Sequence, residues 1–114
     1  MIELTQKQRE YLAVEVIGFE IDGDDYVLVD YINGPGTSFM RSELRDKIDT
    51  WMPDQNLNQS VMLLGKFESW DIEYRLHFDG KNHVSIIDKK VCVADEYLPL
   101  AICLAVLKAS GYEA

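Results

Sequence analysis

The sequence predicts a single α+β domain over residues 1–114, in which helices pack on a small antiparallel sheet. Apolar residues recur at helical intervals near both ends of the chain and alternate with polar residues in the strand-like segments between them. No repeat, low-complexity tract or linker divides the 114 residues, a length that buries one hydrophobic core without disulfides or metals. One core shared by helices and strands is therefore expected.

The first predicted element is a helix over residues 5–17. Thr5 and Gln8 have the spacing of a capping box, in which each side chain bonds the backbone N–H of the other residue. Apolar residues then follow at helical intervals as far as Gly18, which offers a C-terminal stop. The spacing and both end signals agree on one helix.

A hairpin and a short helix are expected next. The Asp22-Gly23 turn signal lies between β-prone runs and predicts a hairpin, or at least one strand over Tyr26–Ile32. The segment NGPGTSF is predicted to be a loop, because glycine and proline punctuate it. Beyond this loop, Ser42–Trp51 is predicted to be a short helix that Pro53 ends.

The second half begins with an amphipathic helix over residues 57–68, which Asn56 or Asn58 can cap and which Gly65 weakens. The clearest strand follows in DIEYRLHFDG, where apolar and polar residues alternate with the two-residue period of a sheet with one buried face. A turn at Gly80 leads to further β segments in HVSII and KVCVA.

The most apolar segment, LPLAICLAVLKASG, closes the chain. The uncharged run from Tyr97 to Leu107 is eleven residues long, whereas a membrane-spanning helix needs about 20 consecutive apolar residues. Asp95 can cap this helix, and Pro99 is tolerated if it lies in the first turn. We expect a buried central helix, and its predicted core stripe consists of Leu100, Cys103, Leu104 and Leu107.

Charge and cysteine usage restrict the classes of function. A formal net charge of −9 repels nucleic-acid backbones and anionic membranes, so direct nucleic-acid binding is not expected. Cys92 and Cys103 are interpreted as reduced, buried thiols of a cytoplasmic protein rather than as a disulfide scaffold. The N-terminal segment MIELTQKQRE carries charges where an export signal needs an apolar run. We therefore expect a cytoplasmic protein.

Several segments together resemble the phage alpha-beta-alpha sandwich domain family. They are the N-terminal helix, the WMP element at Trp51–Pro53, the amphipathic helix, the alternating strands and the closing LPLAICLAVLKASGY. The family consists of small proteins carried by bacteriophages and prophages, mainly of Gram-positive bacteria. The resemblance implies a phage origin, a location in the host bacterial cytoplasm and an alpha-beta-alpha sandwich-like fold over residues 1–114, but no activity or catalytic residue. Residues 22–38 depart from the family pattern.

The acidic cluster of Asp22, Asp24 and Asp25 invites a calcium interpretation, because hard cations favour carboxylate oxygens on a loop. An EF-hand loop requires an oxygen ligand at its fifth position and a glutamate at its twelfth. A loop that began at Asp22 would have Tyr26 and Asn33 at these positions. The motif fails, and a solvated turn is the favoured interpretation. No metal or cofactor is expected.

Other chemistry-bearing residues match no motif. His77, His83, Cys92 and Cys103 lack the paired short spacings of structural zinc sites. A histidine and a thiol could instead form a nucleophile with its base, but an ordinary surface histidine and a filler thiol are favoured. The segment NGPGTS lacks the lysine that a phosphate-binding loop requires, which favours an ordinary surface loop.

The two tryptophans carry the remaining binding hypothesis. Trp51 and Trp70 flank the predicted central helix and are interpreted first as core closures, whose indole N–H groups reach the surface. The alternative is that an exposed tryptophan next to acidic residues forms an anchor for a partner. The candidate partner-binding residues are Trp51, Trp70, Asp22, Asp24 and Asp25.

Two functional hypotheses follow. The first is a non-catalytic, acidic interaction module, encoded by a phage or prophage, that acts on a host or phage protein; its sharper form has the carboxylates mimic nucleic-acid phosphates. The second is a small hydrolase or metal-dependent enzyme that uses His77, His83 and the acidic loop at Asp22–Asp25. The lack of a coherent catalytic set favours the first. A homodimer is a further expectation, because a helix that is apolar all round needs cover on every side.

Overall fold

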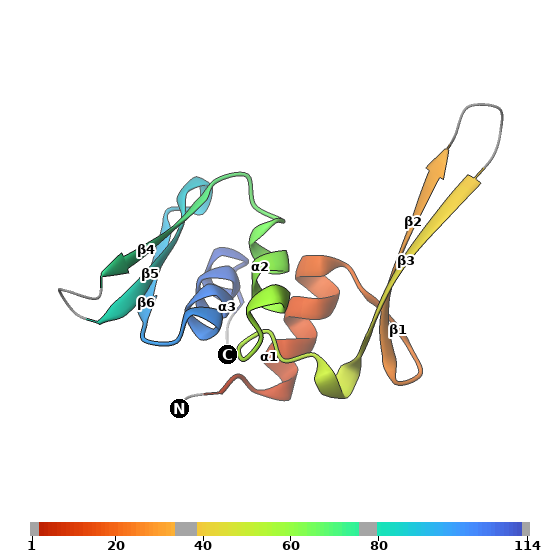
Figure 1. Ribbon diagram of the computed structural model, residues 1–114, viewed down its shortest axis with the longest axis horizontal. Coiled ribbons are helices and arrows are strands. Elements are labelled where there is room, and N and C mark those ends of the chain that lie inside the picture. Colours follow the sequence, from red (N-terminus) through yellow and green to blue (C-terminus); the bar gives the residue numbers. More distant parts are fainter. Residues whose placement is uncertain (1–2, 34–38, 76–79, 113–114) are drawn as a thin grey trace.

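In the computed structural model, residues 3–33, 39–75 and 80–112 are described, with the backbone alone for residues 29–33, 39–42, 74 and 75. Helices form a middle layer between two three-stranded antiparallel sheets, which we call sheet A and sheet B (Figure 1). The α+β class and the antiparallel strand pairing predicted from the sequence are confirmed. The sequence analysis expected one sheet, and the structure has two.

The predicted helix over residues 5–17 is present, but its two halves differ. α1 (Gln6–Tyr11) begins with the capping box: the Gln8 N–H donates to Thr5 Oγ1 over 3.1 Å, and the Thr5 N–H donates to Gln8 Oε1 over 2.8 Å. The chain continues as a wider π-helical segment, η1 (Leu12–Ile17), and leaves it at Gly18 with φ of 93°. A positive φ favours glycine, which explains the stop at this position.

Sheet A consists of β1 (Glu20–Asp22), β2 (Asp25–Asn33) and β3 (Phe39–Lys47), in that order. The predicted hairpin at the Asp22-Gly23 turn is confirmed, because β1 pairs antiparallel with β2. The predicted loop NGPGTSF lies mostly outside the described residues.

The predicted helix over Ser42–Trp51 is wrong. Residues as far as Lys47 belong to β3, and only the short 3-10 helix η2 (Ile48–Thr50) follows. Every residue of β2 is paired with one of β3, so the nine-residue ladder decides the conformation of this segment over its local preference.

α2 (Leu57–Leu64) follows the turn at Pro53. Of the two predicted caps, Asn56 and Asn58, the structure uses Asn56, because the Gln59 N–H donates to Asn56 Oδ1 over 3.1 Å. The helix ends at Gly65, earlier than the predicted residue 68 and at the position expected to be its weak point.

Sheet B consists of β4 (Trp70–Arg75), β5 (Lys81–Ile86) and β6 (Val91–Asp95), with β5 in the centre and the 3-10 helix η3 (Ile87–Lys89) before β6. The alternating strand was predicted correctly as far as residue 75, and residues 76–79 lie outside the described part. The alternation buries one face of β5 and leaves the other half-exposed, as the two-residue period requires.

α3 (Leu98–Ala109) packs against β5, β6 and α2 and occupies the centre of the core. Pro99 lies in its first turn, as predicted, but the N-cap is Tyr97, and Asp95 Oδ1 accepts a hydrogen bond from the Tyr97 N–H over 2.9 Å instead. Leu104 is only half-buried, so the expected stripe is rotated slightly. The fully buried residues of the helix are Ala101, Ile102, Cys103, Ala105 and Val106.

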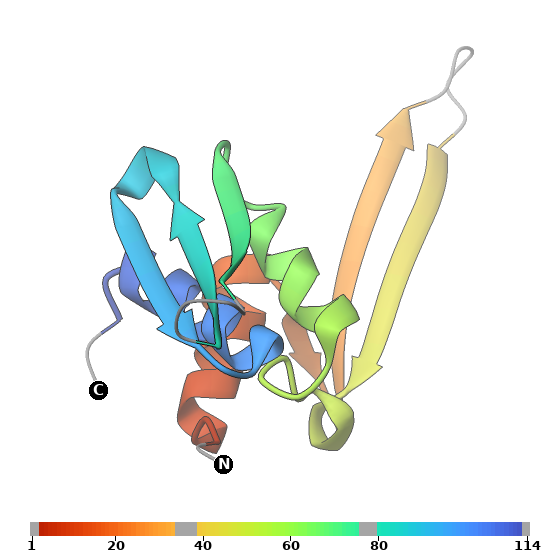
Figure 2. The same cartoon turned by 60° about the vertical axis from the view of Figure 1, so that its left-hand side comes forward.

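The β2–β3 ribbon extends away from the helices as an arm, and both views show it projecting beyond β1 (Figures 1 and 2). The molecule measures 56 × 31 × 23 Å, and its radius of gyration is 15.9 Å. A compact domain of this length has a radius of gyration of about 13 Å, and the arm explains the difference. No helix in the described part of the chain is long and apolar enough to cross a membrane.

Candidate functional site

The acidic turn between β1 and β2 lies at the base of the arm. The positive φ of 61° at Gly23 allows this tight turn, and β3 brings basic residues next to it. Arg45 donates from Nη2 to Asp22 Oδ2 over 3.3 Å and from Nη1 to Asp25 Oδ2 over 3.1 Å. Lys47 Nζ lies 3.6 Å from Asp25 Oδ1.

These ion pairs make basic side chains part of the acidic cluster, which the sequence analysis did not predict. Arg45 also pairs through Nε with Glu43, and this hydrogen bond raises the pKa of its guanidinium more than the contacts with the two aspartates do. Lys47 and Arg45 interrupt the row of carboxylates, whereas a phosphate backbone carries only negative charge. The cluster is therefore a mixed ion-pair network, and the phosphate-mimic hypothesis gains no support from it.

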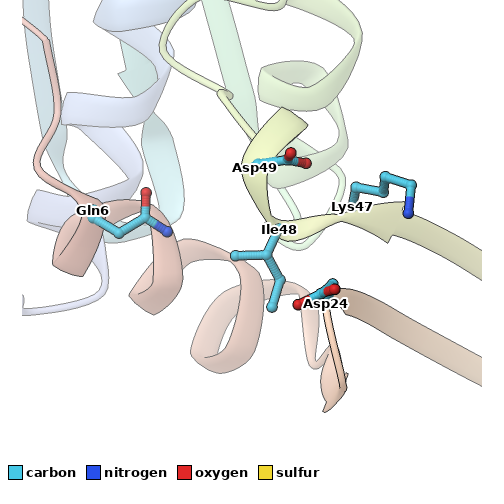
Figure 3. A pocket seen from close by; sticks show the side chains of 5 residues that line it. All are labelled: Gln6, Asp24, Lys47, Ile48 and Asp49. Carbon is cyan, nitrogen blue, oxygen red and sulfur yellow. The ribbon is translucent and has the colours of Figure 1, made fainter.

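A pocket of about 640 Å³ opens beside this network. Gln6 approaches it from the first turn of α1, and the other four side chains come from the base of the arm (Figure 3). The Ile48 N–H donates to the Asp24 carbonyl oxygen over 2.9 Å and so fixes η2 to the β1–β2 turn. The described lining residues are Gln6, Asp24, Lys47, Ile48 and Asp49.

The pocket has an excess of negative charge. The side-chain carboxylates of Asp24 and Asp49 are exposed and have no hydrogen-bond or ion-pair partner among the described residues. The only described cation in the lining, Lys47, is already paired with Asp25. Two uncompensated carboxylates at one pocket favour a cationic group of a partner.

Gln59 of α2 holds the arm base to the helical layer. Its side-chain amide donates to Asp46 Oδ2 over 3.2 Å and to the Thr50 carbonyl oxygen over 3.1 Å, and its Oε1 accepts from the Met52 N–H over 2.8 Å. One nearly buried amide thus joins β3, η2 and the following loop. The pocket wall formed by η2 is positioned by these bonds.

A buried ion pair fixes the other wall, the N-terminal part of α1. Arg9 Nε and Nη2 donate to Asp54 Oδ1 and Oδ2 over 2.9 and 3.0 Å, and the Leu4 N–H donates to Asp54 Oδ2 over 3.1 Å. The hydrogen bond with Asp54 raises the pKa of Arg9. Sequence analysis missed this pair, because its residues lie 45 positions apart and nothing near Asp54 marks a buried carboxylate.

Trp51 belongs to the core, as the first interpretation predicted. Its side chain is completely buried, and its indole N–H donates to the Arg9 carbonyl oxygen over 2.9 Å rather than reaching the surface. Its ring meets those of Phe19 and Tyr26 edge-on, with centroids 5.6 and 6.3 Å apart. In this conformation the ring is not accessible to a partner.

Trp70 is 41% exposed, but it does not share a surface with the acidic turn. It begins β4, in sheet B, and sheet B and the arm lie on opposite sides of the helical layer (Figures 1 and 2). The candidate partner-binding residues are therefore not one constellation. Asp22, Asp24 and Asp25 gather at the base of the arm, Trp70 lies on the far side, and Trp51 lies between them in the core.

The histidine and cysteine candidates are also dispersed. His83 and Cys92 are on the outer face of sheet B, where the register places His83 opposite Ala94, and Cys92 opposite Ser85. Cys92 is exposed, so the prediction that both thiols are buried is wrong for it and right for Cys103. Burial raises the pKa of the Cys103 thiol well above its usual range.

The enzyme hypothesis required His77, His83 and the acidic loop at Asp22–Asp25 to share a pocket. Instead, His83 lies on sheet B and the acidic loop at the base of the arm, and His77 is outside the described residues. Within residues 3–33, 39–75 and 80–112 there is no group of three or more side chains that could hold a metal ion.

Comparisons with known proteins identify a solved structure with a similar fold. No protein-family model matches the chain, and no curated protein matches it. The fold is similar to that in the crystal structure of a phage protein from Bacillus cereus ATCC 14579, with a TM-score of 0.58 and 19% sequence identity. The match covers 100% of this chain and 94% of that one. At this identity the likeness shows a shared fold, and membership of the phage alpha-beta-alpha sandwich family stays a prediction.

Proposed function

We propose that the protein is a phage- or prophage-encoded accessory protein and that it acts as a non-catalytic, acidic interaction module on a host or defence protein in the bacterial cytoplasm. The observation that carries this proposal is the pocket at the base of the arm, where the carboxylates of Asp24 and Asp49 lack partners among the described residues. The fold shared with a phage protein supports the proposed origin.

The partner that fits this pocket presents a lysine or arginine side chain. Its charged head would enter between Gln6 and the arm base and donate charge-assisted hydrogen bonds to the carboxylates of Asp24 and Asp49. Ile48 supplies an apolar contact for the methylene stem of such a side chain. The recognition would be electrostatic in origin, so it should weaken as salt rises.

The charge of the whole chain favours the same class of partner. A net charge of −9 attracts basic surfaces over a distance and raises the rate of encounter with them. The hydrogen bond from the Ile48 N–H to the Asp24 carbonyl oxygen and the three hydrogen bonds of the Gln59 side chain position the arm base, which favours a pocket that is formed before the partner arrives.

Affinity capture from the bacterial host with two matched variants tests the proposal. Asp24→Asn with Asp49→Asn neutralises the pocket, and Asp71→Asn with Asp88→Asn makes the same charge change at exposed positions of sheet B and η3. We expect one host protein to be retained by the wild type and by the control variant, at least about tenfold more than by the pocket variant, because each charge-assisted hydrogen bond is worth more than a neutral one.

Equal retention by both variants would show that charge alone attracts the captured protein and that the pocket has no part in it. Failure of the wild type to retain any host protein would overturn the interaction function itself. The expected complex should also dissociate between about 0.1 and 1 M salt, over which the screening length falls from about 10 Å to 3 Å.

A further inference from the structure

β6 ends the strand order of sheet B, so its outer edge has no strand beside it among the described elements. Sheet edges are normally protected against pairing with another chain by charged side chains, proline or a bulge. The edge strands β1, β3 and β4 all carry charged residues along their length. The first four residues of β6, Val91–Ala94, carry no charge and no proline, and their register with β5 is continuous. β6 is therefore the least protected of the described edges.

The hydrogen bonds between β4 and β5 determine which residues of β5 bond β6. The Ile87 N–H donates to the Ser69 carbonyl oxygen over 2.8 Å, and these two residues continue the β4–β5 ladder by one pair. Hydrogen-bonded and non-hydrogen-bonded pairs alternate along an antiparallel ladder, and successive residues of a central strand bond opposite neighbours. Ile86 and Val84 therefore bond β6.

The same alternation identifies the unused backbone groups of β6. Val91 and Val93 lie opposite Ile86 and Val84 and so bond β5. The residues between and after them, Cys92 and Ala94, direct their N–H and C=O groups to the open edge. An added strand would pair with these two residues.

Charges of opposite sign flank β6 at its two ends. Lys90 directly precedes the strand and Glu96 directly follows it, and both side chains are exposed. Neither side chain has an ion-pair partner within the part of the chain that the structure describes. A strand with opposite charges at its ends is complementary to itself in the antiparallel direction, because each end then meets the opposite end of the other copy.

We propose that β6 pairs antiparallel with β6 of a second copy about a two-fold axis at Val93, so that two copies of sheet B join into one continuous sheet. In this register Cys92 lies opposite Ala94 of the second copy, which brings the unused backbone groups together. Lys90 lies opposite Glu96 of the second copy, twice over. The interface is on sheet B and does not include the pocket at the base of the arm.

The charges distinguish this register from its two neighbours. An axis at Cys92 would oppose the carboxylates of Asp88 and Glu96, and an axis at Ala94 would pair no residues of opposite charge. The axis at the residue between them pairs Lys90 with Glu96 and opposes no like charges. Opposite charges placed directly across from each other stabilise strand pairs, and like charges destabilise them.

The position of α3 fits the joined sheet. α3 packs against both β5 and β6, on the side of sheet B that faces the helical layer (Figure 1). A helix over these two strands lies about one strand spacing, ~4.8 Å, from an axis at the edge of β6. The two copies of α3 would then be about 10 Å apart, the separation of packed helices. Val91 and Val93, which are only partly buried in one copy, would gain cover.

A charge exchange in the purified protein tests the pairing independently of any host partner. Lys90→Glu and Glu96→Lys each give two residues of one sign at the ends of β6, so each variant opposes like charges in its own dimer. We expect sedimentation to give a wild-type dimer and dimerisation at least about tenfold weaker for each variant alone. An equimolar mixture of the two should recover the dimer, because every opposed pair is then complementary.

Lys66→Glu and Glu68→Lys make the same charge changes at exposed positions between α2 and β4, and these controls should dimerise as the wild type does. A monomeric wild type at all concentrations up to about 1 mM, the weak limit of specific association, would overturn the proposal. So would a mixture that stays monomeric, or single variants that dimerise as well as the wild type.

Disulfide trapping tests the register. Cys92, the exposed native thiol, would lie opposite Ala94 of the second copy in a hydrogen-bonded pair with Cα atoms about 5.5 Å apart, which a disulfide can span. A variant with Cys92→Ser and Ala94→Cys, mixed with the wild type under mild oxidation, should give a covalent heterodimer faster than either protein links to itself. Mass spectrometry distinguishes the three products.

Faster linkage within the wild type alone would place the axis at Cys92, and faster linkage within the variant alone would place it at Ala94. Either result would contradict the proposed register. A mixture that forms no covalent dimer would contradict the pairing of β6 with a second copy.

Discussion

Sheets A and B have the same strand order and the same antiparallel pairing, yet their described side chains are buried to different extents. In sheet B, Val84 and Ile86 are completely buried beneath α3. In sheet A, Tyr26 and Val27 are buried and Leu28 is partly buried against the core, whereas Leu44, which is opposite Leu28 in the ladder, is 44% exposed. The alternation of apolar and polar residues thus predicts that a strand has an apolar face, but not which partner covers that face.

The largest expected effect on stability comes from a charge placed in the core under sheet B, and the same change in the arm should be tolerated. Ile102→Asp places an unpaired charge at a completely buried position of α3, and we expect no cooperative unfolding transition from this variant. Leu44→Asp makes the same kind of change in the arm and should leave a folded protein. Urea titration followed by circular dichroism distinguishes them. A folded Ile102→Asp variant would mean that α3 does not form the shared core.

The next largest expected effect is the difference between the two ion-pair networks in their contribution to the free energy of unfolding. Asp54→Ala leaves the buried Arg9 without its carboxylate and is expected to lower the free energy of unfolding by about 3 kcal/mol. Arg45→Ala, in the exposed network of sheet A, should change it little, because solvent screens that network. Urea unfolding of both variants measures the contrast. Equal losses would contradict the assignment of Arg9 and Asp54 to the core.

Apolar truncations in the two sheets, at Val84 of the central strand β5 and at Leu44 of the edge strand β3, sharpen the comparison. Val84→Ala removes two buried methyl groups from sheet B and should cost about 1–2 kcal/mol of unfolding free energy. Leu44→Ala should cost less than about 0.5 kcal/mol, since the side chain is 44% exposed. If Leu44→Ala destabilised the protein as much as Val84→Ala, the arm would belong to the same cooperative core.

The smallest effect is a pH dependence that belongs to the core alone. The pKa of Cys103 is raised by burial, so above the ordinary thiol value of 9.0 the unfolded chain loses a proton that the folded chain keeps. Stability present below pH 9 is then lost as the pH rises, at up to about 1.4 kcal/mol per pH unit. Cys103→Ala should flatten this slope between pH 9 and 10, whereas Cys92→Ser should leave it unchanged.

Much of the core was predictable because its signals are local. The capping box at Thr5, the cap at Asn56 and the apolar segment of α3 each depend on residues close together in the sequence, and the structure confirms them. The helix prediction for Ser42–Lys47 was wrong because pairing with β2, which is distant in the sequence, decides the conformation of this segment.

The candidate site was predictable only in part, for the same physical reason. The acidic turn at Asp22–Asp25 was recognised, but Arg45 and Lys47 reach it only through the β2–β3 ladder. Asp49 was not recognised, because it joins the pocket only through the change of direction at η2. Such contacts become visible only when the register of the strands is known.

Amide hydrogen exchange tests the central claim most directly: that sheet B belongs to the core and that the β3 edge of the arm around Leu44 does not. We expect the amides of Val84 and Ile86 to exchange only through global unfolding, and those of Leu44 and Asp46 to exchange through local opening in dilute protein. Equal protection of β3 and β5 in dilute monomer would contradict the account.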